Sequence, residues 1–381
     1  MERVLVCLLA STRAHQLTFP SIKRQVLDEL NADLALALAI DENYDYTNPF
    51  WQHAKYRWTA PDFSDVGEAF DLAQRWLSQE HNVPAPDWRS MLRIKGIWQG
   101  GIRSPDPQPS ASSVLPFCRW LLLRGLQQDG VLDRYDRFVI SRSDFVWLRP
   151  HPPLSLLDRE AIWVPDGEYW GGLPDRHLVV SRADVVNCLN LIEEILLYPF
   201  QLYEEMKNHQ CWNNEAFMTQ HQRFEEPKQK SAWNNEQFLA RHLERKGLLN
   251  KVKVFPYVMY TARPIGDPRS TWSPGSFEPA VGHYVKYPKE FRAATAYATI
   301  IRSRADWEGG AWMQFDPRSV ASSPPVSLAY RFRYACQRAY YERSYYYCKF
   351  LSALRRSGRV RRFVRFCKRM FQPAVCNWTL H

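Results

Sequence analysis

The first forty residues constrain the fold most, because they place two apolar runs on either side of a helical spacing. Val4–Ala10 is a continuous apolar run, and residues 32–40 form a second one. Between them, residues 19–30 space their apolar side chains as a helix does, with a proline near the start. Strand, helix and strand in this order predict the start of a parallel α/β sheet with a right-handed crossover. Arg13 and Asp41, which follow the two strands, are therefore expected at one edge of the sheet.

Residues 135–147 carry a second pattern, an apolar run that ends in polar residues and then resumes. Residues 138–140 are typical of a buried strand, and residues 145–148 of a short second one. Arg142 and Asp144 stand between them, where an open α/β sheet binds ligands. A carboxylate can hold a divalent cation, and a guanidinium can bind phosphate through two parallel hydrogen bonds. The pair indicates a site for a nucleotide diphosphate with its metal, and the alternative is a surface ion pair at a strand end.

The rest of the chain continues the alternation of strands and helices. Residues 102–113, rich in Pro and Ser, are typical of a loop. The sequence therefore predicts an α/β protein with one domain over residues 1–290, a linker or extension over 291–325 and a helical tail over 326–381. The further elements that we expect are helices at 66–79, 114–128 and 183–197 and strands at 161–164, 178–181 and 252–255.

Charge is concentrated in the tail. The chain has a net charge of +10, of which residues 326–381 contribute +12, so that the preceding residues sum to −2. A near-neutral body argues against nucleic-acid binding by the whole domain. Basic residues mixed with Tyr and Phe are typical of a helix lying on an anionic membrane surface. An RNA-binding tail has a similar composition, and a solvated helix packed on the body is the third interpretation.

Cysteine spacing and hydropathy exclude several classes of protein. The eight cysteines contain no C-x-x-C pair, which argues against zinc or redox spacings and favours a reducing compartment. No stretch reaches the roughly 18 apolar residues that a bilayer span needs. We therefore expect a cytoplasmic protein, with the tail as a candidate for peripheral attachment to the inner face of the membrane.

A repeated segment supplies a further acidic residue. Residues 212–221, which begin Trp-Asn-Asn-Glu, recur as residues 233–242. Each copy predicts a helix start with Asn as the N-cap and Glu in the first turn. One of Glu215 and Glu236 is expected to face the site, and the cleaner amphipathic pattern after Glu236 favours that copy. A second carboxylate fits a general base that removes a proton from an attacking hydroxyl.

Several motifs of other enzyme classes are absent from the sequence. The chain contains no G-x-x-x-x-G-K-[ST], no G-x-G-x-x-G that opens a helix, and no G-x-S-x-G. These absences argue against a P-loop NTPase, a dinucleotide-binding enzyme and a serine hydrolase. Sugar transfer from a nucleotide donor is the natural remaining function for an α/β domain of this kind.

A series of short motifs occurs in order along roughly residues 1–290. They are Ser11-Thr12-Arg13, Phe19-Pro20-Ser21-Ile22-Lys23, Leu30-Asn31-Ala32-Asp33, Tyr135-Asp136 with Arg142-Ser143-Asp144, Gly171-Gly172 with Asp175-Arg176-His177, and Asn235-Glu236-Gln237-Phe238-Leu239. In this series the chain resembles the GT-A glycosyltransferases related to bacterial lipopolysaccharide and capsule synthesis proteins of the WavE type. The resemblance implies a Rossmann-like domain that transfers a sugar from a nucleotide-sugar donor to a surface polysaccharide or a lipid-linked glycan.

The resemblance also implies a D-x-D motif, from which this chain departs. In that family the motif follows a central strand and holds the metal and the donor diphosphate. Here Arg142 takes the place of the first acid, and Asp144 remains. Two expectations stay open: Asp144 binds Mn²⁺ or Mg²⁺, or Arg142 neutralises the phosphates without a metal.

The expected roles of the site residues follow. We expect Asp175 or Glu236 as the catalytic base, Arg13, Asp41, Arg142, Asp144 and Arg176 at the donor, Tyr169, Trp170 and His177 at the acceptor, and Asp144 at the metal. Asp175 and Arg176 could instead form a structural turn, and the two aromatic side chains could fill the core. The alternative function is that of a non-catalytic glycosyltransferase-like or basic binding protein, whose tail holds a membrane surface or another anionic partner.

Overall fold

The computed structural model describes residues 2–104, 108, 111–221, 232–263, 275–278 and 280–320. The basic tail over residues 326–381 lies outside the described residues, as does part of the loop predicted at 102–113. The helical character of the tail therefore stays a prediction.

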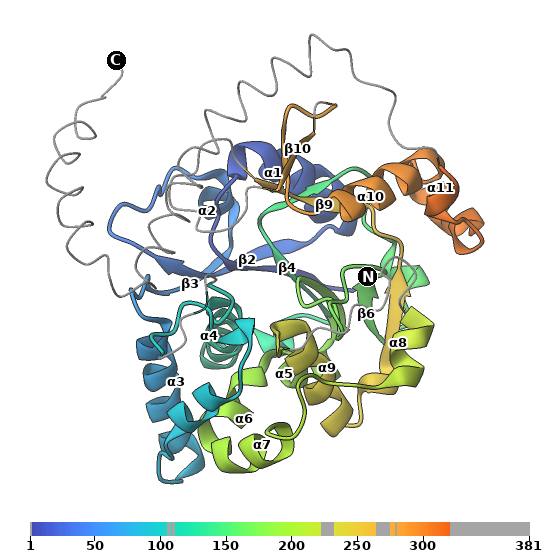
Figure 1. The fold of residues 1–381 in the computed structure, drawn as a ribbon. Helices are drawn as coiled ribbons and strands as arrows, with labels where there is room; N and C mark the ends of the chain where they lie inside the picture. The colour runs from blue at the N-terminus through green and yellow to red at the C-terminus, as the bar shows by residue number, and fades with distance from the viewer. Residues whose placement is uncertain are drawn as a thin grey trace, which may run out of the picture.

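A seven-stranded sheet forms the centre of the molecule (Figure 1). Its order is β3–β2–β1–β4–β7–β6–β8, in which β7 runs antiparallel to both neighbours and the other pairs are parallel. The predicted α/β class is confirmed. The strands are β1 (Val4–Ala10), β2 (Asp33–Ile40), β3 (Tyr56–Pro61), β4 (Arg137–Arg142), β6 (Ile162–Pro165), β7 (His177–Ser181) and β8 (Val252–Phe255).

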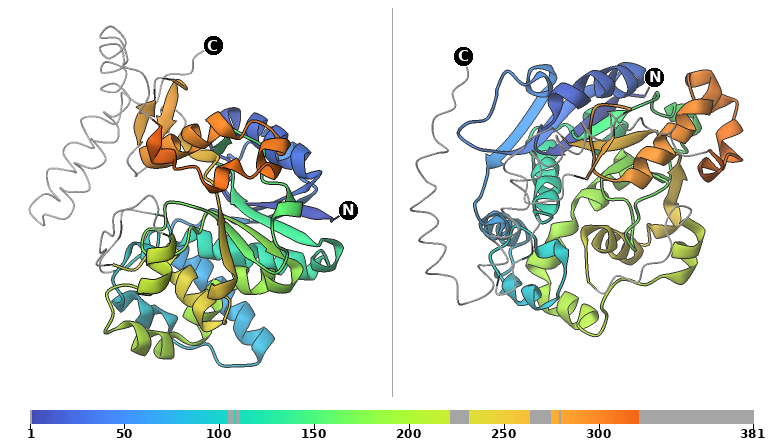
Figure 2. Two further views of the ribbon diagram at one scale, coloured as in Figure 1. Left: turned by 90° about the vertical axis from the view of Figure 1, so that its right-hand side faces the viewer. Right: turned by 45° about the horizontal axis from the view of Figure 1, so that its top comes forward.

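Helices cover both faces of this sheet, so that the molecule has three layers (Figure 2). One layer contains α3 (Val66–His81), α4 (Val114–Gln128), α5 (Arg182–Leu189), α6 (Leu191–Leu197), α7 (Pro199–Met206) and α9 (Asn235–Arg245). The opposite layer contains α1 (His15–Ile22), α2 (Pro49–His53), α10 (Pro288–Ile300) and α11 (Arg304–Glu308). The chain also forms α8 (Glu215–His221) and 3-10 turns at Trp88–Arg93, Ile97–Gln99, Leu132–Arg134, Leu154–Leu156, Leu249–Lys251, Ala311–Met313 and Pro317–Ser319.

The three layers explain why β1 is apolar throughout. Leu5 and Cys7 point into the core shared with α3 and α4, whereas Val6 and Leu8 point into the core shared with α1 and α10. A strand covered on both faces needs apolar side chains at every position, because both sets are removed from water.

A smaller sheet continues from the end of β4. Its order is β10–β11–β9–β5, and its pairs are antiparallel. The strand predicted at 145–148 forms here, and not in the central sheet. The strands are β5 (Phe145–Trp147), β9 (Met259–Arg263), β10 (Ser276–Glu278) and β11 (His283–Val285).

Two predicted helices differ from the structure. The helix expected at 19–30 begins four residues earlier and winds as a π-helix over Lys23–Asp28. Pro20 lies inside α1, where its missing N–H removes one bond of the regular helical ladder. The helix expected at 183–197 is divided at Asn190, whose φ of −87° and ψ of 40° are not helical.

Helix α10 runs through the predicted domain boundary at residue 290. Ala293 and Tyr297 are buried in the same core as β1, and the indole N–H of Trp307 donates to the carbonyl oxygen of Pro150 over 3.0 Å. The segment predicted as a linker thus begins with helices that pack on the sheet, and the division into domains stays a prediction. Across the described ranges, no helix combines the length and the apolarity of a bilayer span.

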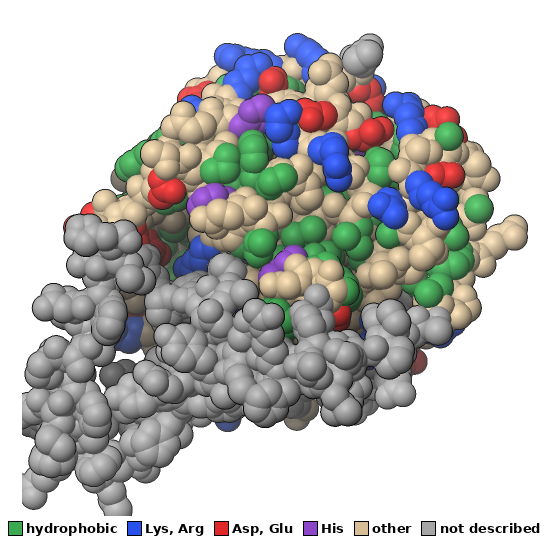
Figure 3. Space-filling model, turned by 90° about the horizontal axis from the view of Figure 1, so that it is seen from above, with side chains coloured by type: hydrophobic (Ala, Val, Ile, Leu, Met, Phe, Trp, Pro, Cys, Tyr) green, Lys and Arg blue, Asp and Glu red, His purple; other side chains and the backbone are tan. Residues whose placement is uncertain are grey.

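The face that carries α1, α10 and α11 has a mixed surface. Lys and Arg side chains are interspersed there with acidic and apolar ones (Figure 3). This mixture agrees with the net charge of −2 that the sequence gives for the residues before 326.

Candidate functional site

The carboxyl ends of β1, β2 and β4 open into one cleft of about 600 Å³. Its walls come from the loops after these strands, the end of β9, the first turn of α9 and the segment after β11. An open α/β sheet places ligands at this edge. The residues predicted for the donor and for catalysis line the cleft together: Arg13, Asp41, Arg142, Asp144, Asp175, Arg176 and Glu236.

Arg142 and Asp144 form a two-pronged ion pair at the end of β4. The Nε and Nη2 atoms of Arg142 donate to the two carboxylate oxygens of Asp144 over 3.0 and 2.5 Å. The exposed fractions of the two side chains are 24% and 17%. Burial alone would raise the pKa of Asp144, but Arg142, Lys286 and Arg263 outweigh it and lower that pKa. Asp144 is therefore an ionised carboxylate whose oxygens are both engaged by Arg142.

Two further cations, Arg263 and Lys286, line the same cleft and were missed in the sequence. Arg263 ends β9, and Lys286 follows β11 and donates its backbone N–H to the carbonyl oxygen of Thr261 over 2.9 Å. Burial and the charge of Arg142 lower the pKa of Lys286 to about 7, although Asp144 opposes the shift. Burial also lowers the pKa of Arg263. The sequence did contain a signal for both residues, because each follows a short apolar run, as Arg142 does.

Arg176 is almost fully buried and is held in place from α10. Its Nη1 atom donates to Oγ1 of Thr261 over 3.2 Å and to Oε1 of Glu290 over 3.5 Å. Glu290 also accepts the backbone N–H of Thr261 over 3.0 Å. The guanidinium lies 4.5 Å from the centre of the Tyr287 ring, which is another wall of the cleft. Glu290, a first-turn residue that sequence reasoning did not identify, therefore fixes the position of Arg176.

Glu236 and Asp175 are two carboxylates on one wall of the cleft. Burial raises the pKa of Glu236 to about 8, and the nearby charge of Asp175 adds to the shift. The backbone carbonyl of Asp175 accepts a hydrogen bond from Nη2 of the buried Arg119 over 2.5 Å, which fixes the turn before β7. Glu215, the equivalent residue in the other copy of the repeat, is exposed at the start of α8 and lies outside the cleft lining.

The three residues predicted to bind the acceptor lie outside the lining of the cleft. Tyr169 is fully buried, and the ring of Trp170 lies 5.8 Å from that of Tyr287, behind the wall. His177 is buried in the core, with Nδ1 hydrogen-bonded to Oγ of Ser141 over 3.0 Å. Burial lowers the pKa of His177 well below its ordinary value. Their positions thus give no support to the predicted acceptor contacts.

Aromatic and amide side chains form the end of the cleft beyond β1 and β2. The hydroxyl groups of Tyr44 and Thr12 are hydrogen-bonded over 2.9 Å, and Nδ2 of Asn48 donates to the Thr12 hydroxyl over 2.8 Å. The ring of Tyr44 lies 5.4 Å from that of Trp51 in an edge-on contact. These hydrogen bonds and ring contacts hold Tyr44 in place at this end of the cleft.

The residues at Asp144 do not fit the divalent-cation site predicted there. Mn²⁺ and Mg²⁺ prefer several oxygen ligands. Around Asp144 the cleft offers one carboxylate, bound by Arg142, and the cations Arg263 and Lys286. Within the part of the chain that the structure describes, no group of three or more His, Cys, Asp or Glu side chains could hold a metal ion.

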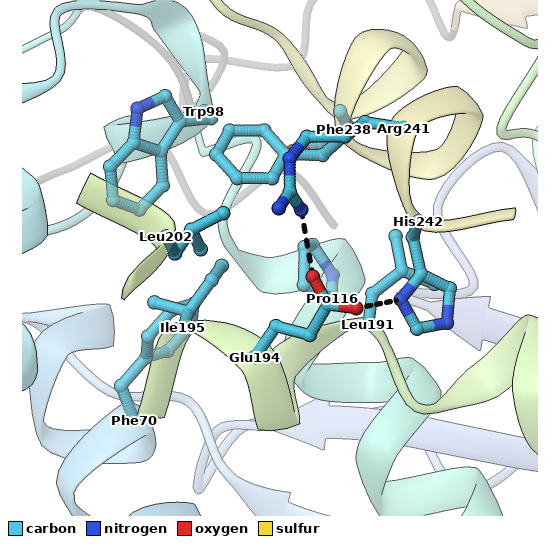
Figure 4. Close-up of a pocket in the computed structure, with 11 residues that line it drawn as sticks. Phe70, Trp98, Pro116, Leu191, Glu194, Ile195, Leu202, Phe238, Arg241 and His242 are labelled. Carbon is cyan, nitrogen blue, oxygen red and sulfur yellow. Dashed lines mark hydrogen bonds and ion pairs between the residues drawn. The ribbon is translucent and has the colours of Figure 1, made fainter. Parts of the chain in front are cut away.

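A second, much smaller cavity lies beneath α9 (Figure 4). Its volume of about 10 Å³ suffices for one water molecule at most. There Glu194 accepts a hydrogen bond from Nη1 of Arg241 over 2.7 Å and contacts Nδ1 of His242 over 3.0 Å. Burial would raise the pKa of Glu194, but His242 and Arg241 lower it to about 2. This ion-pair network anchors α9 to α6, and thereby supports the helix that carries Glu236.

Comparisons with known proteins give limited information. No protein-family model matches the chain, and no curated protein matches it. Among solved structures, the chain is similar to mouse xyloside xylosyltransferase 1 in its apo form, with a TM-score of 0.32 and 8% sequence identity. The match covers 68% of this chain and 86% of that one. A likeness this distant carries no argument about function.

Proposed function

We propose that this chain is a glycosyltransferase that binds a nucleotide sugar in the cleft and transfers its sugar to a glycan. The observation that carries the proposal is the convergence of Arg13, Arg142, Arg176, Asp175 and Glu236 on one cleft at the carboxyl edge of the sheet. A fold alone does not specify a function, and here the argument comes from charge and geometry. The mostly parallel sheet with antiparallel β7 supports the assignment to a GT-A-like domain.

The donor fits the cleft in one direction. Arg142 and Arg13 offer guanidinium groups to the two phosphates, and guanidinium groups bind phosphate oxygens in pairs. The nucleoside then extends toward Tyr44, an aromatic side chain in the lining of the cleft. The sugar lies at the opposite end, beside Glu236.

The reaction needs a base near the sugar. A hydroxyl oxygen of the acceptor attacks the anomeric carbon, and the bond from that carbon to the phosphate oxygen breaks. The electron pair of that bond stays on the diphosphate, where the arginines stabilise the added charge. The hydroxyl proton goes to the carboxylate of Glu236 or Asp175, as in general-base catalysis. The pKa of Glu236, which burial raises to about 8, makes its carboxylate a strong proton acceptor.

The acceptor and the cellular location that we propose are inferred from the sequence. The resemblance to WavE-type proteins favours a surface polysaccharide or a lipid-linked glycan as the acceptor. A tail with a charge of +12 could hold a cytoplasmic enzyme at an anionic membrane surface, where such an acceptor would lie. Nucleic acid is not part of the proposal, because the residues before 326 are near neutral.

The test is release of nucleoside diphosphate from a panel of UDP-, GDP- and CDP-sugars. Donors are first screened for thermal stabilisation, because a ligand that binds the folded state raises its melting temperature. Glu236→Gln should abolish turnover, whereas Glu215→Gln, the same change at the exposed copy of the repeat, should have no effect. If no donor stabilises the protein or releases its nucleotide, the enzyme proposal is wrong and the alternative of an anion-binding protein gains.

A further inference from the structure

We infer that Arg263 and Lys286, together with Arg142, bind the donor diphosphate directly, so that no divalent cation is needed for binding. This inference rests on the proposed function and deepens it. It is supported by the geometry around Asp144, by the strands that place the two cations, and by the charge beside the diphosphate.

The first step concerns the carboxylate expected to hold a metal. Both oxygens of Asp144 accept hydrogen bonds from Arg142, over 3.0 and 2.5 Å. A metal at Asp144 would have to displace the half-buried guanidinium of Arg142 and would lie beside the further positive charges of Arg263 and Lys286. The bidentate pair instead gives Arg142 a fixed orientation, because the planar guanidinium cannot rotate while Nε and Nη2 both donate to Asp144. Asp144 is in this arrangement a positioning residue for Arg142.

The second step concerns the backbone that places the two missed cations. The N–H of Ala262 donates to the carbonyl oxygen of Asp144 over 2.8 Å, which sets Arg263 beside the ion pair. Lys286 is tied to β9 through its hydrogen bond to Thr261. The strands that hold both are buried, with Ala262 and Val285 each 1% exposed. Sites on rigid, packed elements hold a ligand geometry better than loops do.

The third step is the charge beside the diphosphate. Arg263 and Lys286 both line the cleft, and both are near enough to Asp144 to lower its pKa, as Arg142 does. Burial lowers the pKa of Lys286 to about 7, and a bound diphosphate would favour its charged form. Opposite charge within a few ångströms of a partly buried anion stabilises it much more strongly than in bulk water. These two residues therefore supply what a metal would supply to the diphosphate.

The experiment is titration calorimetry of the whole chain with UDP, GDP and CDP, first in EDTA and then with Mn²⁺ or Mg²⁺. We expect binding of one nucleotide in EDTA, with an affinity that changes less than threefold when the metal is added. Lys286→Met and Arg263→Met should each weaken binding by about tenfold or more, the size of one lost charge-assisted hydrogen bond. Lys289→Met and Arg292→Met are matched controls, because they remove the same charge from exposed positions of the neighbouring helix.

Two further variants distinguish a lost anion contact from misfolding and from loss of a metal ligand. Lys286→Arg retains the charge and should retain most of the affinity, which separates a lost anion contact from misfolding. Asp144→Asn should weaken binding to the same extent in EDTA and with Mn²⁺, because it loosens the orientation of Arg142, whereas loss of a metal ligand would weaken binding only when the metal is present.

The outcomes separate this inference from the proposed function. Binding that requires Mn²⁺ or Mg²⁺, or that survives Lys286→Met and Arg263→Met unchanged, overturns the inference and leaves the glycosyltransferase proposal standing. Absence of binding by every nucleotide in every buffer overturns the proposed function, and the inference with it.

Discussion

Glu236 shows how strongly surroundings decide the chemistry of a single side chain. It has the same local sequence as Glu215, yet Glu215 is exposed in α8 and Glu236 lines the cleft beside Asp175. Burial and the like charge of Asp175 favour the neutral carboxyl, while Arg176 and Lys286 favour the charged form. The balance raises the pKa of Glu236 to about 8. A carboxyl with this pKa is partly protonated at neutral pH and ionises in the alkaline range.

If Glu236 is the base, the turnover of the donor should increase with pH. The carboxylate is the active form, so kcat/KM should rise from pH 6.5 and level off above about pH 9. Glu236→Gln should remove this rise and lower the rate by about 10²-fold or more, the usual contribution of a general base. Initial rates of nucleotide release between pH 6 and 9.5 measure both effects. A flat profile in the unchanged protein, or an equal loss in Glu215→Gln, would assign the base to another residue.

At this scale the sequence predicted that Arg13, Asp41 and Arg142 lie together at one edge of the sheet, and it missed Arg263 and Lys286. These three follow or end the parallel strands β1, β2 and β4, and parallel strands end at one edge of a sheet. Lys286 follows β11 after a short apolar run, but that run does not indicate that the small antiparallel sheet meets the chain at Asp144. Tyr169 is buried outside the lining of the cleft, in a loop with positive φ angles at Glu168 and Trp170, and its role at the acceptor stays a prediction.

At the scale of elements, two local features fix the position of α9: a capping box at its start and the loop that packs against its first turn. Asn234 and Gln237 form a reciprocal capping box, in which each side chain bonds the backbone N–H of the other. The repeat predicted this start correctly, because Asn and an early glutamate are typical of a helix N-terminus. The loop that packs against the start of α9 could not be predicted from the sequence. The loop at Gly172 packs against the first turn, and Leu173 donates its N–H to the carbonyl oxygen of Glu236 over 2.9 Å.

Gly172→Ala should therefore damage the site without touching any charged group. A Cβ atom at this position would lie 2.2 Å from the carbonyl carbon and oxygen of Glu236, so the loop or the helix must move. We expect the free energy of unfolding to fall by about 1–3 kcal/mol, as for other overpacked positions. Nucleotide release should fall as well, because Glu236 moves with the first turn.

Urea denaturation and the transfer assay measure the two effects of Gly172→Ala. Gly309→Ala is the control, since the nearest atom to its Cβ would lie 3.3 Å away and Gly309 is remote from the lining of the cleft. Equal stability and activity of the two variants would show that the loop yields without disturbing α9.

At the scale of the whole molecule, two neutral histidines tie stability to pH. His151 and His177 are fully buried, with their rings 5.6 Å apart. Burial lowers the pKa of His151 to about 4 and that of His177 well below its ordinary value. The unfolded chain binds protons at these positions near pH 6.5, whereas the folded chain does not. The stability that they contribute is thus present above pH 6.5 and is lost as the pH falls toward 4.

The free energy of unfolding should accordingly decrease on acidification. For His151 the loss approaches about 3 kcal/mol by pH 4, since each unit of pKa shift corresponds to about 1.4 kcal/mol. Denaturant titrations at pH 7.5, 6 and 5 measure the decrease. His151→Phe, which keeps a ring among Trp147, His177 and Phe255, should flatten the dependence. The same slope in both proteins would show that other groups control acid stability.

The uneven charge of the chain leads to a prediction for the tail. The residues before 326 sum to −2 and show mixed charges on the face in Figure 3, whereas residues 326–381 carry +12. Anionic lipids attract such a segment by about 1 kcal/mol per basic residue near the surface, and salt screens the attraction. The full chain should therefore bind vesicles that contain phosphatidylserine, and should be released by salt.

A chain truncated after Pro325 should lose this binding and keep its affinity for nucleotide, because the described walls of the cleft lie before residue 288. Vesicle sedimentation with neutral phosphatidylcholine as the control, followed by calorimetry with nucleotide, measures both properties. If truncation instead lowers the melting temperature and leaves vesicle binding unchanged, the tail packs on the body and the membrane interpretation is wrong. Loss of nucleotide binding on truncation would place part of the tail in the donor site.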